Sequence, residues 1–113
     1  MKATIPLKPL SLNNCYRGRR FSTRQKKQYD RDLQILLPKV RVDGPLYTVT
    51  FRFFLQRPFA GDLDNLCKNL LDNIVDRGII TSDKKVVEIH LYKYRASKDS
   101  IEVQVESLVG DAS

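Results

Sequence analysis

The chain has 113 residues, of which 42% are hydrophobic and 29% charged, so it reads as one small globular domain over residues 1–113 and not as a disordered chain. No apolar run approaches the roughly 20 residues that span a bilayer, and the N-terminus lacks a signal-peptide apolar region, so we expect a cytoplasmic protein outside the membrane. The net charge is +7, which excludes an acidic protein and favours a polyanionic partner.

The positive charge is concentrated in the first half of the chain. Residues 1–61 hold 13 Lys/Arg and 3 Asp/Glu, whereas residues 62–113 hold 7 Lys/Arg and 10 Asp/Glu. This asymmetry predicts binding to nucleic acid or another anionic surface; a basic protein without such a partner is the alternative. The two cysteines, Cys15 and Cys67, are too few for a disulfide framework or a zinc site, and we expect free thiols.

The first half contains a predicted strand, a basic loop and a predicted helix. The strand is expected over residues 3–7, and the polar, glycine-containing loop over residues 11–20. Ser22 and Gln25 have the spacing of a capping box, which predicts a helix from this point to about Leu37, before a proline that stops it.

The second half contains three predicted strands and the clearest helix of the sequence. Apolar and polar residues alternate over 46–55, the pattern of a half-buried strand. Asp62 is a suitable N-cap and Gly78 a suitable left-handed C-terminal residue for the helix between them. Its apolar residues follow a helical period: Leu63, Leu66, Cys67, Leu70, Leu71, Ile74 and Val75.

The last two strands are expected over about 85–95 and 101–108, and we predict that they form a hairpin. The element order is then β-α-β-α-β-β. This order predicts a small α+β domain with a mixed or antiparallel sheet and two helices packed on one face.

Acidic residues gather where the second helix begins. Asp64 and Lys68 fall on one edge of its apolar stripe, and Asp62 lies at the helix mouth about one turn away, so the three side chains can converge. Asp83 enters from the loop beyond the helix. Carboxylate oxygens suit Mg²⁺, which usually takes one or two carboxylates together with waters and substrate phosphate.

These residues also have simpler interpretations. Asp62 can serve only as an N-cap, and Asp64 and Lys68 can form a surface i,i+4 ion pair. Asp72 and Asp76 continue that spacing and are interpreted as a solvated face, and Asp83 can be a turn residue. A carboxylate-x-carboxylate pattern at a helix start is therefore a weak signal on its own.

The surrounding residues add a family resemblance. The run Asp62-Leu63-Asp64-Asn65-Leu66-Cys67-Lys68, followed by Leu71-Asp72-Asn73-Ile74 and by Gly78-Ile79-Ile80-Thr81-Ser82-Asp83-Lys84-Lys85-Val86-Val87, resembles the RusA family of Holliday-junction resolvases. The match extends more loosely to the N-terminal half through Asn13-Asn14-Cys15-Tyr16.

The resemblance implies specific roles. Asp62, Asp64 and Asp83 are then the Mg²⁺-binding acids, with Mn²⁺ as a substitute, and Lys68 is the catalytic lysine. The family acts as a homodimer on four-way or branched DNA, nicks two opposed strands to leave ligatable ends in recombination and repair, and is often encoded by phages and prophages.

One difference from the family concerns DNA binding. Family members can carry a dense arginine run directly before the first acid, whereas residues 57–61 hold a single positive charge. We therefore expect contacts with DNA from a dispersed set: Asn14, Tyr16, Arg17, Arg19, Arg20, Lys26, Lys27 and Arg57. Tyr16 can stack on unpaired bases or pack against the domain.

The functional prediction is a Mg²⁺-dependent, structure-selective endonuclease that resolves four-way DNA junctions. The alternative is a non-catalytic module that binds branched or structured nucleic acid, in which the carboxylates are caps and surface pairs. Metal binding by the carboxylates distinguishes the two.

Overall fold

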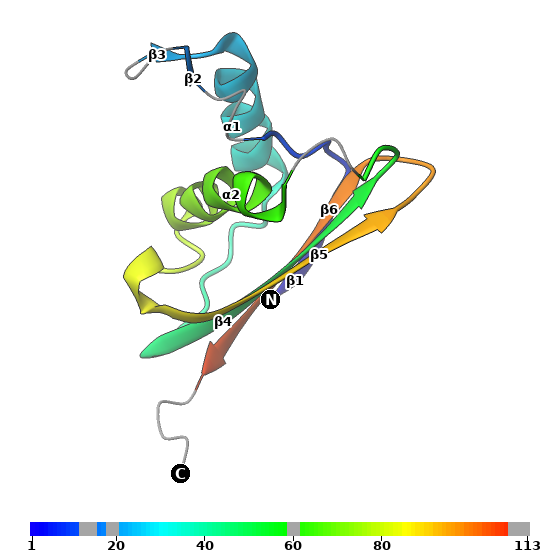
Figure 1. The fold of residues 1–113 in the computed structure, drawn as a ribbon. Coiled ribbons are helices and arrows are strands. Elements are labelled where there is room, and N and C mark those ends of the chain that lie inside the picture. The colour runs from blue at the N-terminus through cyan, green and yellow to red at the C-terminus, as the bar shows by residue number, and fades with distance from the viewer. Residues whose placement is uncertain (12–15, 18–20, 59–61, 109–113) are drawn as a thin grey trace.

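The computed structural model describes residues 1–11, 16–17, 21–58 and 62–108, which form an α+β fold (Figure 1). Two helices cover one face of a four-stranded sheet: α1 (Arg24–Leu36) and α2 (Leu63–Arg77). The predicted fold class is confirmed.

The main sheet is mixed. Its strands lie in the order β1-β6-β4-β5, with β4 parallel to β5 and antiparallel to β6, and with β1 antiparallel to β6. Their bounds are Lys2–Ile5 for β1, Leu46–Leu55 for β4, Val86–Arg95 for β5 and Ser100–Leu108 for β6.

Three short elements complete the described chain. The strands β2 (Tyr16–Arg17) and β3 (Phe21–Ser22) form a small antiparallel pair within and just after the region expected to be a loop. A 3-10 turn, η2 (Asp83–Lys85), precedes β5 directly.

The alternation in β4 places its apolar side chains against the helices. Val49, Phe51 and Phe53 are fully buried, and Leu55 is nearly so, as the sequence predicts. Alternate residues of β6 join the same core, together with the apolar stripe of α2. Burial of this shared face is the main stabilising interaction between sheet and helices.

The predicted hairpin between the last two strands is wrong, because β4 lies between β5 and β6. The strands β4 and β5 with the intervening α2 form a β-α-β unit, and parallel neighbours require such a crossover. The chain then passes around the end of β4 to reach β6. This passage is held by bonds from Ala96 N–H to the Leu55 carbonyl (2.9 Å) and from Gln56 N–H to the Asp99 carboxylate (2.8 Å).

Helix α1 starts one position later than the capping box predicts. Its N-cap is Thr23, whose hydroxyl accepts a hydrogen bond from the Lys26 N–H at 3.1 Å, whereas Ser22 belongs to β3. The helix ends at Leu36 with Leu37 as C-cap, directly before Pro38, as expected for a residue preceding proline. The first strand was expected over residues 3–7. It starts one residue earlier and ends two residues earlier, at Lys2–Ile5.

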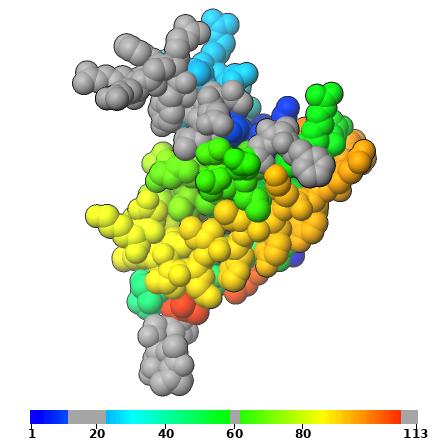
Figure 2. All heavy atoms as spheres, viewed as in Figure 1, coloured from blue at the N-terminus to red at the C-terminus, as the bar shows by residue number. Residues whose placement is uncertain are grey.

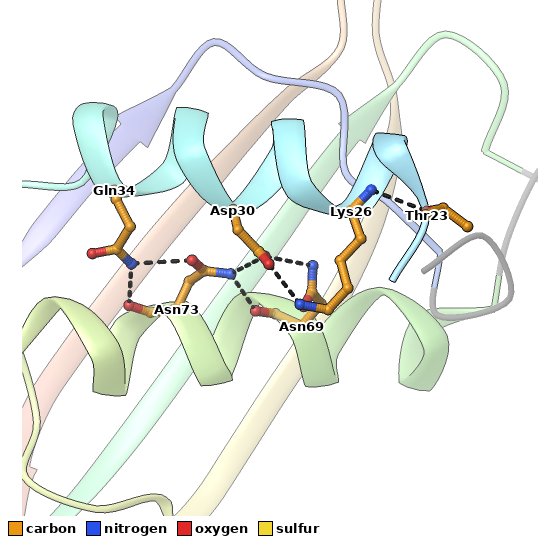
Figure 3. Close-up of polar contacts among 6 residues, drawn as sticks. All are labelled: Thr23, Lys26, Asp30, Gln34, Asn69 and Asn73. Carbon is orange, nitrogen blue, oxygen red and sulfur yellow. Dashed lines mark hydrogen bonds and ion pairs between the residues drawn. The ribbon is translucent and has the colours of Figure 1, made fainter. Parts of the chain in front are cut away.

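A polar network joins α1 to α2 (Figure 3). Asp30 Oδ1 accepts hydrogen bonds from Asn73 Nδ2 (2.8 Å) and Asn69 Nδ2 (3.3 Å), and its other oxygen pairs with Lys26. Gln34 Nε2 donates to the side chain and backbone oxygens of Asn73. Asn69 and Asn73 are buried, so these bonds satisfy amides that would otherwise be costly inside the protein.

Candidate functional site

The site lies along α2, from Asp62 at its N-terminal end to Asp72, and the turn η2 brings Asp83 to Lys68. Gly78 ends α2 in the left-handed region (φ 85°), which lets the chain reverse at that point. Ile79 and Ile80 are fully buried and anchor the returning segment, with Val42 N–H bonded to the Ile79 carbonyl at 2.8 Å. Ser82 then caps η2 by accepting a bond from the Lys84 N–H, which places Asp83 at the start of the turn.

Lys68 lies between two carboxylates. Its ammonium nitrogen is 3.1 Å from Asp72 Oδ1 and 3.6 Å from Asp83 Oδ2. The hydrogen bond and charge of Asp72, followed by those of Asp83, raise the pKa of Lys68 above its ordinary value. The side chain therefore remains a cation at neutral pH, suited to contact a phosphate oxygen and unsuited to accept a proton.

Asp72 was interpreted from sequence as part of a solvated face, yet it is the nearer partner of Lys68. Among the described residues, the i,i+4 ion pair on this side of α2 joins Lys68 to Asp72 and not to Asp64. The helical spacing of 68 and 72 was the available signal, because residues four apart on a helix are neighbours.

Asp62 and Asp64 both present exposed carboxylates at the mouth of α2. Asp62 occupies the predicted N-cap position with extended backbone, but its side chain makes no capping hydrogen bond. Asp64 lies in the first turn, and its Oδ1 accepts a bond from the Asn65 N–H at 3.0 Å. Asp62 is therefore not committed to the simple capping role that was its alternative.

The donor chemistry of these acids fits Mg²⁺. Within the described part of the chain no three acidic, histidine or cysteine side chains are gathered closely enough to hold a metal ion together. Mg²⁺ usually takes only one or two protein carboxylates and completes its shell with water and substrate phosphate. The exposed carboxylates of Asp62 and Asp64 meet that requirement, and Asp83 contacts Lys68 from the turn η2.

A groove of about 350 Å³ runs from this site between α2 and β5. Figure 2 shows α2 (green) and β5 (yellow to orange) adjoining on one face of the molecule. The groove is lined by Asp64, Cys67, Lys68, Leu71, Ile89 and Leu91. Burial in its floor raises the pKa of the Cys67 thiol, which favours the neutral, unreactive form.

A larger hollow of about 870 Å³ lies between the segment after β1, the start of α1 and the end of β4. Three exposed basic residues, Lys8, Arg24 and Arg57, line it together with the acids Asp32 and Asp99. Arg57 was predicted from sequence to contact nucleic acid. Lys8 was not singled out from sequence, because only the folded chain brings it to one cavity with Arg24 and Arg57.

The remaining residues predicted to bind DNA divide into three groups. Lys27 is exposed on α1, whereas Lys26 is paired with Asp30 and its side chain is only 17% exposed, so it stabilises the α1–α2 contact. Tyr16 and Arg17 form β2. Asn14, Arg19 and Arg20 lie outside the described residues.

Comparisons with known proteins connect this site to a family. Within the described residues, no helix is long and apolar enough to cross a membrane. A search among curated proteins found no match. The family model Endodeoxyribonuclease RusA matches residues 11–106, a span that includes all four residues of the predicted catalytic set and most of the fold. The chain therefore belongs to the RusA family of endodeoxyribonucleases, which resolve Holliday junctions.

Proposed function

We propose that this endonuclease is a Mg²⁺-dependent resolvase that acts as a homodimer and nicks opposed strands of a four-way DNA junction. The observation that carries the proposal is the position of the Lys68 ammonium, 3.6 Å from Asp83, on the helix whose N-terminal end carries the exposed acids Asp62 and Asp64. A fixed cation beside hard oxygen ligands is the arrangement that phosphodiester hydrolysis needs.

The acids Asp62, Asp64 and Asp83 would hold Mg²⁺ in this proposal. The bound ion supplies charge neutralisation at the phosphate and lowers the pKa of a water. Hydrolysis would form a bond from a water oxygen to phosphorus and break the bond from phosphorus to a bridging oxygen, which would leave with a proton.

Lys68 contributes directly to binding and charge stabilisation. Its ammonium contacts a non-bridging oxygen of the scissile phosphate, where negative charge increases in the transition state. Asp72 and Asp83 restrict the position of that ammonium before DNA arrives. The N-terminus of α2 adds a partial positive charge at the start of the helix, where Asp62 and Asp64 lie.

Basic residues away from the site bind the DNA arms. The hollow described above is lined by Lys8, Arg24 and Arg57. Lys27, three residues after Arg24 on α1, is also exposed. Phosphate contacts of this kind supply affinity and orientation without reading sequence, which suits recognition of a branched shape.

The test is a gel assay of an end-labelled synthetic four-way junction, with linear duplex as the control substrate. Wild-type protein should make paired symmetric nicks only when Mg²⁺ is added, and Mn²⁺ should substitute. Asp64→Asn should abolish cleavage and leave junction binding intact or tighter, because a negative charge is removed.

Two outcomes would overturn parts of the proposal. A junction that is shifted but uncut under every metal condition would indicate a non-catalytic binding module. Equal loss of binding and cleavage in Asp64→Asn would assign that residue to folding.

A further inference from the structure

We propose that the groove between α2 and β5 holds the unstacked base of a nucleotide adjoining the scissile phosphate. The inference rests on the proposed function and assigns a nucleotide-binding subsite to residues outside the catalytic set. Ile89 of β5 is the substrate-contacting residue on which the argument depends.

The groove and the site share residues. Lys68 and Asp64 line the groove, and Lys68 also contacts Asp83. A phosphate bound at the Lys68 ammonium has its own deoxyribose and base as the next groups along the strand. The apolar part of the groove therefore lies where one nucleotide would extend.

The chemistry of the groove suits a base. Its floor contains Cys67 and Leu71, both buried, and its β5 wall contains Ile89 and Leu91. Ile89 is 45% exposed, so covering it with the flat face of a base removes apolar surface from water. Among the described residues that line the groove, Lys68 is the one cation, and it complements the phosphate attached to that base.

The size of the groove favours a nucleotide over a protein partner. A volume of about 350 Å³ is at the lower end of small-molecule sites. A protein segment that lies in a groove usually needs a longer apolar surface with several anchor positions.

This subsite would also explain a preference for branched DNA. A base inside a duplex is stacked on both faces and must be extruded to enter such a groove, which costs free energy. That cost is smallest for a base that is already unpaired, as at an opened crossover. The groove would therefore select the branch point through the cost of unstacking.

The experiment is a cycle that combines a protein variant with a substrate variant. Ile89→Ala shortens the groove wall, and an abasic residue placed next to the scissile phosphate removes the base. Each change alone should lower the single-turnover cleavage rate about tenfold. Both changes together should cost no more than either one, because they remove the same contact.

Val87→Ala is the matched control. Val87 is also an exposed apolar residue of β5, 48% exposed, and it does not line the groove. This variant should cut the ordinary junction at the wild-type rate and remain fully sensitive to the abasic residue. Independent, multiplying losses in the Ile89→Ala cycle, or no effect of abasic residues on either side of the phosphate, would overturn the subsite.

A second readout separates this inference from the proposed function. The fluorescent base 2-aminopurine, placed beside the scissile phosphate, should brighten when wild-type protein binds the junction without metal, and Ile89→Ala should suppress that change. Brightening without any cleavage in Mg²⁺ would keep the subsite and reject the resolvase. Normal cleavage without brightening at any flanking position would keep the resolvase and reject the subsite.

Discussion

The ammonium of Lys68 lies 3.6 Å from the carboxylate of Asp83, although one residue belongs to α2 and the other to the turn after it. The contact exists because α2 is followed by a reversal at Gly78 and by a buried isoleucine pair. A site built this way depends on the helix, on its C-terminal cap and on the segment that returns.

Replacing Lys68 should separate catalysis from stability. Lys68→Met should lower the single-turnover cleavage rate roughly 100- to 1000-fold, the usual loss when one donor to a developing negative charge is removed. The free energy of unfolding should change by less than about 1 kcal/mol, because both ion pairs are exposed and screened by solvent. The control is Lys84→Met, which changes an exposed lysine in the turn η2 next to Asp83 and should cut normally. Similar losses in both variants would argue against a specific role for Lys68.

Removing Asn73 should destabilise the protein through the α1–α2 network. Asn73→Ala removes one part-buried hydrogen bond from each of Asp30 and Gln34 and a buried one to the Asn69 carbonyl, and should lower the free energy of unfolding by about 2 kcal/mol. Urea denaturation measures this change. Gln28→Ala, which removes an exposed bond to Asp32 on the same helix, should stay within about 0.5 kcal/mol of wild type. Equal midpoints for the two variants would contradict a structural role for the network.

Substituting Gly78 should show a conformational cost. A side chain at this position meets no atom within 4 Å, so only the left-handed backbone, φ 85°, opposes it. Gly78→Ala should lower the free energy of unfolding by about 1–2 kcal/mol, and Gly78→Asn by less, because asparagine adopts this conformation more readily. Thermal unfolding of the three proteins gives the order. An alanine variant as stable as wild type would mean that the chain leaves α2 in another way.

The Cys67 thiol should resist reaction in the native protein and make stability fall at high pH. Burial raises its pKa above the ordinary value of 9.0, so the folded state keeps a proton that the unfolded state releases. Its contribution is fully present below pH 9 and is lost as the pH rises through the folded-state value. The free energy of unfolding should therefore fall more steeply above pH 9 in wild type than in Cys67→Ala. Mass spectrometry should show slow iodoacetamide labelling of Cys67 at pH 8 and rapid labelling in urea.

Local sequence patterns predicted which segments form helices and strands better than they predicted which strands pair in the sheet. The alternation in β4 and the helical period of α2 identify both elements, because each period directly reports one buried face. Nothing in the periods of β5 and β6 says which strand lies beside which. The short connection between them favours a hairpin, and the structure instead places β4 there, because the crossover through α2 makes β4 and β5 parallel neighbours.

The candidate site shows the same limit. The spacing of residues 62, 64 and 68 on one helix predicts that their side chains can converge, whereas the Lys68 ammonium pairs with Asp72 and with Asp83, and the second contact required the tertiary fold. The pairing of Asp72 with Lys68 was open to prediction from helix geometry alone. The grouping of Lys8 and Arg24 around one hollow was not, because their elements are brought together only by packing.

The register of β5 on β4 has a consequence for the tolerance of this site to insertions and deletions. The pairing shifts by one residue where β5 begins, from Tyr47 opposite Val86 to Thr48 opposite Glu88, and Asp83 lies just before that point. Each residue added to or removed from a strand moves its neighbours by about 3.3 Å and exchanges the two faces of the sheet. A single-residue insertion or deletion between Asp83 and Glu88 would therefore displace the Asp83 carboxylate from Lys68 or turn Ile89 away from the groove. The site thus requires a fixed chain length in this short stretch as strictly as it requires the acids themselves.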